Sequence, residues 1–218
     1  MHWLINSSIG RKFIMSISGL FLILFLIFHM SMNLVLVFSP AAYDQVTHFL
    51  GANWYAIVGT LVLAAGFIVH ILYATILTLQ NRKARGSDRY AVSNTKDATW
   101  SSKNMYVLGF VVLAFLVLHM IQFWYQMQYK ELVGMELQYT SSAQFVIDVF
   151  KQPLYVGVYL VAFVALWFHL THGFWSALHS VGWNNKIWMK RLQTLSYVVA
   201  TIIIAGFAFI PVFIYFCY

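Results

Sequence analysis

The chain has 218 residues and a formal net charge of +7, and 61% of its residues are hydrophobic whereas only 9% are charged. Soluble domains carry about 25% charged residues, so this composition excludes an ordinary water-soluble domain and indicates an integral membrane protein. The basic residues lie in short segments between apolar runs, which argues against the continuous basic patch of a nucleic-acid-binding protein.

Five apolar segments are long enough to cross a bilayer. A span needs about 20 mostly apolar residues, because the hydrocarbon core is about 30 Å thick and a helix rises about 1.5 Å per residue. We therefore predict an all-α membrane protein with a single domain, residues 1–218, and spans at about 13–38, 54–80, 105–127, 154–179 and 192–215. The loop around Pro40 and residues 81–103 and 129–153 connect them, with an interfacial helix expected near 145–150.

The lysine and arginine residues set the expected orientation. If the spans alternate in direction, two basic residues, Lys130 and Lys151, reach one side and eleven reach the other. Basic loops stay in the cytoplasm, so we expect the N-terminus inside the cell and the C-terminus outside. The eleven expected on the inside are Arg11, Lys12, Arg82, Lys83, Arg85, Arg89, Lys96, Lys103, Lys186, Lys190 and Arg191.

Four of the eight histidines lie well inside four different spans: His29, His70, His119 and His169. An imidazole in hydrocarbon is costly unless it is paired, so an intramembrane histidine indicates a functional site. For any one of them alone, a hydrogen bond to a neighbouring Ser, Thr or carbonyl group is the simpler explanation. Their distribution over four helices favours a common role.

The depths of these histidines form two levels. His29 and His119 each lie 11 positions before the outer end of their helix, whereas His70 and His169 lie 17 and 16 positions after it. These spacings correspond to distances of about 16 Å and about 24 to 26 Å from the outer ends of the helices. Two histidines at one level of a helical bundle can supply both axial ligands of a haem iron. The spacing leaves His172, one turn after His169, as an alternative ligand.

We therefore predict two stacked haem b groups within a bundle of the first four helices, the outer one held by His29 and His119 and the inner one by His70 and His169. Because both axial positions would be filled, electron transfer is favoured over oxygen chemistry. Candidates for contacting the haem propionates near the inner face are Arg11, Lys12, Ser16, Lys103 and His179.

Several short sequences resemble the five-helix, two-haem cytochrome b subunit of succinate dehydrogenase and fumarate reductase, in the style of Bacteroidetes sequences. They are SIGRK at 8–12, SGL at 18–20, FHM at 28–30 and FHLTHGFW at 168–175, together with the four-histidine pattern. The last is the most specific, because it looks like the family's Phe-His, three residues, Gly, aromatic segment. The resemblance covers essentially the whole chain and selects His169 over His172.

The resemblance implies a membrane anchor that relays electrons between a membrane quinone, with menaquinone favoured, and a flavoprotein and an iron–sulfur subunit on the cytoplasmic side of a bacterial inner membrane. FAD and iron–sulfur clusters belong to those partners, since this chain has one cysteine, Cys217, and no dinucleotide fingerprint. It therefore should not act on succinate or fumarate alone.

Proton exchange with the quinone is expected at a membrane face, because every Asp and Glu lies outside the five spans. His48 and Asp44 are the candidates for the quinone site. In one branch of the family an acidic residue stands two positions before the fourth-span ligand, and Trp167 occupies that position here.

Three other functions are compatible with the sequence. The chain could be the di-haem subunit of another quinone-linked complex, such as a formate dehydrogenase or hydrogenase. It could also be a haem-free transporter or scaffold. The count of eight histidines alone suggests a membrane di-iron oxygenase, but such sites need clustered histidines at one membrane face.

Overall fold

The computed structural model describes residues 5–51, 53–85, 99–183 and 185–218. It is 89% helix, and the described residues form no strand. Five stretches of helix are long and apolar enough to cross a membrane, as predicted, so the chain has the character of a multi-pass membrane protein. They are α2 (Ser8–Phe38), α4 (Trp54–Arg85), α5 (Trp100–His119) with its continuation, α8 (Pro153–Ser180) and α9 (Lys186–Cys217).

Helices α5 and α9 begin earlier than their apolar segments do, and a polar side chain caps each of them. The side chain of Thr99 accepts a hydrogen bond from the backbone N–H of Ser102, and that of Asn185 accepts one from Trp188. Such caps satisfy backbone donors that have no partner within the helix. As a result α5 begins at Trp100, five residues before the predicted span, and α9 begins at Lys186, six residues before it.

The third span changes its helical geometry directly after His119. A π-helix, η1 (Met120–Tyr129), follows α5 and leads into the short helix α6 (Lys130–Leu132). A π-helix has a wider turn than an α-helix and is found frequently at functional sites. Hydrophobic periodicity did not predict it.

The prediction of a loop around Pro40 is wrong, since these residues form α3 (Pro40–Phe49). Ser39 caps this helix, and Pro40 occupies the first turn, where its missing N–H costs nothing. The predicted helix in the fourth connector is present as α7 (Ser142–Phe150). Asp44 ties the two together, because its carboxylate accepts hydrogen bonds from the Ser141 hydroxyl at 2.8 Å and the Ala143 backbone N–H at 2.7 Å.

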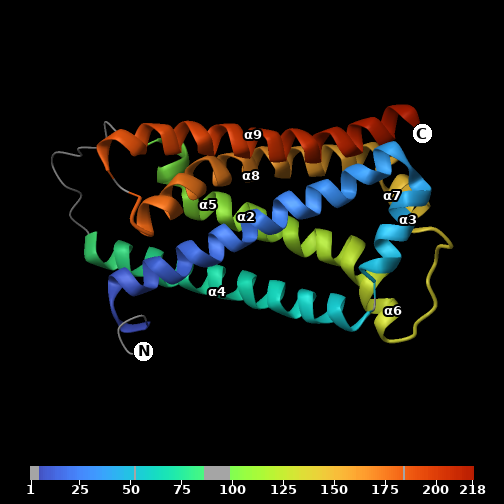
Figure 1. Cartoon of the computed structure of the whole chain (residues 1–218), viewed down its shortest axis with the longest axis horizontal. Coiled ribbons are helices and arrows are strands. Elements are labelled where there is room, and N and C mark those ends of the chain that lie inside the picture. The colour runs from blue at the N-terminus through green and yellow to red at the C-terminus, as the bar shows by residue number, and fades with distance from the viewer. Residues whose placement is uncertain (1–4, 52, 86–98, 184) are drawn as a thin grey trace.

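The short helices lie at one end of the bundle. Figure 1 shows α3, α6 and α7 at the end that also holds the C-terminus, whereas the start of α2 and the end of α8 lie at the opposite end. Burial and the charge of Asp44 raise the pKa of Tyr43 in α3. Its hydroxyl therefore stays protonated and donates to Asn33 Oδ1 at 3.4 Å, which joins α3 to α2.

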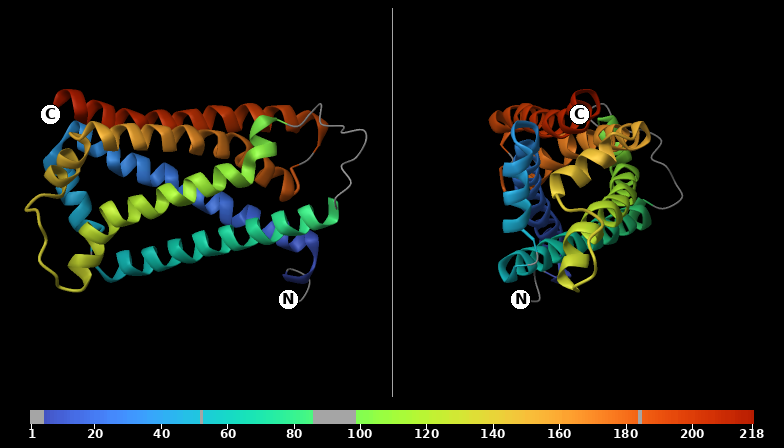
Figure 2. Two further views of the ribbon diagram at one scale, coloured as in Figure 1. Left: turned by 180° about the vertical axis from the view of Figure 1, so that it is seen from behind. Right: turned by 90° about the vertical axis from the view of Figure 1, so that its right-hand side faces the viewer.

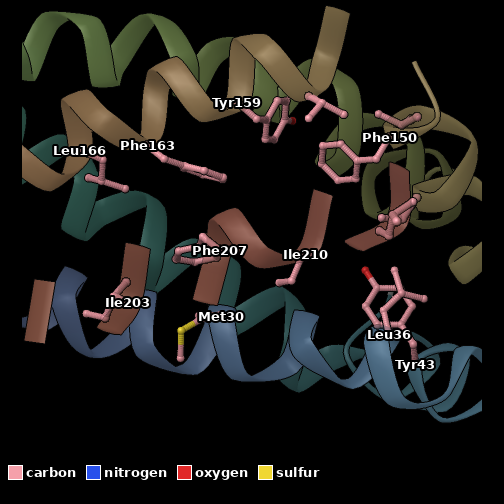
Figure 3. Close-up of a cluster of buried hydrophobic side chains, with 14 of the residues drawn as sticks. Met30, Leu36, Tyr43, Phe150, Tyr159, Phe163, Leu166, Ile203, Phe207 and Ile210 are labelled. Atoms are coloured by element: carbon pink, nitrogen blue, oxygen red, sulfur yellow. The ribbon is translucent and has the colours of Figure 1, made fainter. Parts of the chain in front are cut away.

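Packing is uneven around the bundle. Helix α2 packs against α4, α8 and α9, and α8 packs against α5 and α9, but neither α2 with α5 nor α4 with α8 forms an extended contact among the described residues. Figure 2 shows the five helices from behind and from one end. The buried apolar cluster lies between α2, α7, α8 and α9, where Met30, Phe163 and Phe207 meet (Figure 3).

Helix α4 has the most exposed apolar surface. None of the residues in its most apolar window is buried, and large side chains such as Leu61 (65% exposed) and Ile68 (57% exposed) point outward. Water-soluble monomers rarely expose contiguous apolar surface of this extent. The surface of α4 therefore fits a bilayer.

Candidate metal centres

Two pairs of histidines face each other across the diagonals of the four-helix bundle. The rings of His29 (α2) and His119 (α5) have centroids 5.8 Å apart and planes at 89°. The rings of His70 (α4) and His169 (α8) have centroids 6.4 Å apart and planes at 72°. Each pair joins two helices that do not otherwise pack closely. The structure thus brings together the histidines that the sequence places at the same depth.

The separation of the rings suits two ligands on opposite sides of one metal ion. A metal–imidazole bond is about 2.0 to 2.1 Å long, which places two opposed nitrogen atoms about 4 Å apart and their ring centres about 6 Å apart. In the described part of the chain, no group of three or more His, Cys, Asp or Glu side chains lies close enough to hold a metal ion. A metal ion held by one of these pairs would therefore need its remaining ligands from another group.

Aromatic side chains surround the outer pair. Phe25 stacks on His29 with ring centroids 5.3 Å apart, and Phe207 lies 5.7 Å from the same ring. Phe123 lies 5.3 Å from the ring of His119. These rings exclude water and present flat apolar faces, which is the environment that a bound macrocycle requires.

His119 has a hydrogen-bond partner on the neighbouring helix α8. The hydroxyl of Tyr159 donates to Gln122 Oε1 at 2.8 Å, so its oxygen is free to accept the Nδ1–H of His119 at 3.3 Å. Gln122 lies in the π-helix three residues after His119. In a ligand histidine, a bond of this kind on Nδ1 fixes the tautomer and directs Nε2 toward the metal.

His70 has an equivalent partner on α2. The hydroxyl of Ser18 donates to the carbonyl oxygen of Met15 at 2.9 Å, so it can accept the Nδ1–H of His70 at 3.4 Å. Ser18 is buried. The chain Met15–Ser18–His70 therefore holds the imidazole of α4 against the first helix.

Two glycines lie against the rings of the inner pair. A Cβ atom added to Gly19 of α2 would lie 3.2 Å from Cε1 of His70, and one added to Gly109 of α5 would lie 3.4 Å from Cε1 of His169. Because glycine has no side chain, both positions leave room for a histidine ring, and any larger residue would reduce that room. The buried Nδ1 of His169 has no hydrogen-bond partner among the described residues.

The predicted propionate contacts differ in their surroundings. Ser16 is 2% exposed, and its hydroxyl has no hydrogen-bond partner in the described chain. Arg11 donates from Nε to the carbonyl oxygen of Ile5 at 2.8 Å. Lys12, Lys103 and His179 are exposed at the same end of the bundle. An orphaned buried hydroxyl is costly, so Ser16 is the residue of this set that most needs a polar partner.

The remaining candidates belong to neither pair. His48 is exposed in the last turn of α3, and the Asp44 carboxylate accepts a hydrogen bond from the backbone of α7. His172 faces Trp175, with ring centroids 5.1 Å apart, whereas His169 faces His70. Trp167 donates its indole N–H to Thr201 Oγ1 of α9 at 3.0 Å.

Sequence reasoning missed the residues that position the rings. Tyr159 of α8 reaches His119 and donates to Gln122, and Ser18 of α2 reaches His70. No spacing along one helix predicts a contact that depends on how two helices meet. Gln122 was recognisable only as a polar residue inside an apolar span.

Compared with known proteins, the chain matches no family model, no curated protein and no solved structure.

Proposed function

We propose that this chain is the membrane-anchor cytochrome b subunit of a succinate:quinone or quinol:fumarate oxidoreductase. His29 and His119 hold the outer haem b, and His70 and His169 hold the inner one. The observation that carries the proposal is the pair of imidazoles on each diagonal of the bundle, with ring centres 5.8 and 6.4 Å apart. The succinate or fumarate connection is supported by the sequence resemblance, above all the segment FHLTHGFW at 168–175.

The residues of this chain would bind the two haems, orient the histidine ligands and surround them with apolar side chains. Two imidazoles at each site would hold a haem iron, and the haem would supply a centre that accepts and passes on single electrons. Tyr159 and Ser18 fix the rings of His119 and His70, and the aromatic residues around His29 exclude water. Ser16 offers its hydroxyl to a propionate at the inner site.

The flavin, the iron–sulfur clusters and the dicarboxylate site belong to partner subunits at the basic, cytoplasmic end. This chain passes electrons between them and a membrane quinone, with menaquinone favoured, in a bacterial inner membrane. The test is to purify the tagged protein from its native membranes and identify what accompanies it. A flavoprotein with covalently bound flavin and an iron–sulfur protein support the proposal. A molybdenum or nickel protein would assign the chain to another quinone-linked complex, and a colourless protein would contradict the haem sites.

The orientation of the chain can be tested with its only cysteine. Cys217 is exposed in the last residues of α9, and the positive-inside rule places it outside the cell. A membrane-impermeant maleimide should therefore label Cys217 in intact spheroplasts, and Cys217→Ser should abolish the signal. Labelling only after the membrane is permeabilised would reverse the proposed topology.

Removing the hydroxyl of Tyr159 should raise the midpoint potential of the outer haem. The bond from Nδ1–H to an acceptor makes the imidazole a stronger donor to ferric iron. A neutral hydrogen bond contributes about 1 kcal/mol, and a tenfold change in a one-electron equilibrium is about 59 mV, so we expect Tyr159→Phe to raise the potential by roughly 20 to 40 mV.

Redox titration followed in the visible spectrum measures this effect. Tyr155→Phe is the matched control, because Tyr155 lies one turn earlier on α8 and has no part in the His119 contact. A change in the inner haem alone, or equal changes in both variants, would contradict the role given to Tyr159.

A further inference from the structure

Helix α7 packs one face against the end of the bundle where α3 and the C-terminus lie (Figure 1). Its opposite face, with Gln144 and Asp148, is exposed. A short helix with one apolar face is held in place mainly by burying that face against a larger apolar surface. The side chains of the inward face are each at most 8% exposed: Ala143, Val146, Ile147, Val149 and Phe150.

Aromatic contacts connect α7 to His119 through one intervening layer of side chains. Phe150 lies edge-to-face against Tyr159 of α8, with ring centroids 5.0 Å apart, and its ring is 5.9 Å from that of Phe123 in the π-helix. Tyr159 and Phe123 lie 6.1 and 5.3 Å from the ring of His119. Figure 3 shows Phe150 beside Tyr159. Helix α7 therefore covers the layer of side chains that contacts the outer histidine pair.

A single side chain of α3, Asp44, supplies the hydrogen bonds that join the start of α7 to another helix of the described chain. One carboxylate oxygen accepts from the Ser141 hydroxyl at 2.8 Å, and the other accepts from the Ala143 backbone N–H at 2.7 Å. Hydrogen bonds to a charged acceptor are about twice as strong as those between neutral groups. The bond between Gln144 and Asp148, in contrast, stays within α7.

The two ends of α7 are held in different ways. At its C-terminal end only Lys151 and Gln152 separate it from α8, so this end is fixed by the chain itself. The segment before it, residues 133–140, is mostly exposed and turns at Gly134 with φ of 69°, so it restrains the start of α7 little. Hydrophobic attraction has no preferred direction. The position of the N-terminal end therefore depends on the carboxylate of Asp44.

We propose that α7 is a lid over the outer histidine pair, with Lys151 and Gln152 as its hinge and Asp44 as the latch that keeps its N-terminal end closed. Release of the latch lifts the start of α7 and exposes the layer of Phe123 and Tyr159 to water and polar solutes. The lid thus controls access to the outer pair from this end of the bundle. Both carboxylate oxygens of Asp44 are used in the closed state.

The test measures how fast a cysteine on the buried face of α7 reacts with a sulfonated maleimide. Val146, which is 3% exposed, is replaced in the variant Val146→Cys/Cys217→Ser, and the full-length protein is studied in lipid nanodiscs, where both membrane faces are accessible. We expect labelling about 100-fold slower than at Gln144→Cys, on the exposed face of the same helix. Adding Asp44→Ala should speed labelling at Val146→Cys by about tenfold or more and leave that at Gln144→Cys within about twofold.

Two further variants separate release of the latch from a general loss of structure. Asp148→Ala removes an acidic residue of α7 that bonds within its own helix, and should leave labelling at Val146→Cys within about twofold. Asp44→Asn keeps one acceptor oxygen and the size of the side chain, and should speed labelling by about three- to tenfold. Circular dichroism of the same samples should show the helix content of the wild type.

Three results would overturn the inference. Labelling at Val146→Cys that is as fast as at Gln144→Cys before the latch is changed would show that α7 does not close. Equal acceleration by Asp44→Ala and Asp148→Ala, or none by either variant of Asp44, would show that Asp44 is not the latch. Because the signal comes from a cysteine, a protein without haem would contradict the proposed function and leave this test of the lid unaffected.

Discussion

Alanine variants of the four histidines are expected to remove haem in pairs. His29→Ala and His119→Ala should each lose one of the two haems, and the double variant should lose no more than either single variant, because both side chains hold the same iron. The double variant His29→Ala/His70→Ala should lose both haems. Reduced-minus-oxidised spectra together with haem-to-protein ratios measure these outcomes.

The combination of losses tests the pairing as well as the ligands. His172→Ala is the matched comparison on α8 and should retain two haems. If His169→Ala keeps its haem and His172→Ala loses one, the inner ligand is His172. If His29→Ala/His119→Ala loses both haems, the pairs are not those that the ring distances of 5.8 and 6.4 Å indicate.

The second large effect is expected at Gly19. A Cβ at this position lies 3.2 Å from Cε1 of His70, and the two methyl groups of valine extend further into the same space. Gly19→Val should therefore push His70 away from His169 and weaken retention of the inner haem by about 10- to 100-fold, the range found when groups that orient a metal ligand are changed. The outer haem should be unaffected.

Gly59→Val separates this effect from a general disturbance of a helix. Gly59 is exposed on α4, and an added Cβ meets nothing within 4 Å. It should leave both haems in place. The spectrum of Gly19→Val should match that of His70→Ala; loss of the outer haem instead would contradict the position assigned to Gly19.

The sequence predicted the five spans because apolar length is a property of each segment by itself. It missed α3 because the Ser39 cap and Pro40, which are helix-start signals, were interpreted as a connector between spans. The π-helix after His119 has no hydrophobic signature, so periodicity could not predict it.

The depth of each histidine follows from counting residues, which is why the sequence could place His29 level with His119 and His70 level with His169. The partners of these rings depend on contacts between helices. Tyr159 and Ser18 reach them from elsewhere in the chain, and no pattern within one segment records such a contact.

We propose that each diagonal of the bundle holds one haem iron between two imidazoles. A pyridine haemochromogen assay on the purified wild-type chain, combined with electron paramagnetic resonance of the oxidised protein, tests this arrangement. The proposal predicts two haem b per 25.1 kDa chain, both ferric and low-spin with two histidine ligands. A colourless protein, a single haem per chain, or a high-spin signal from an open axial position would contradict it.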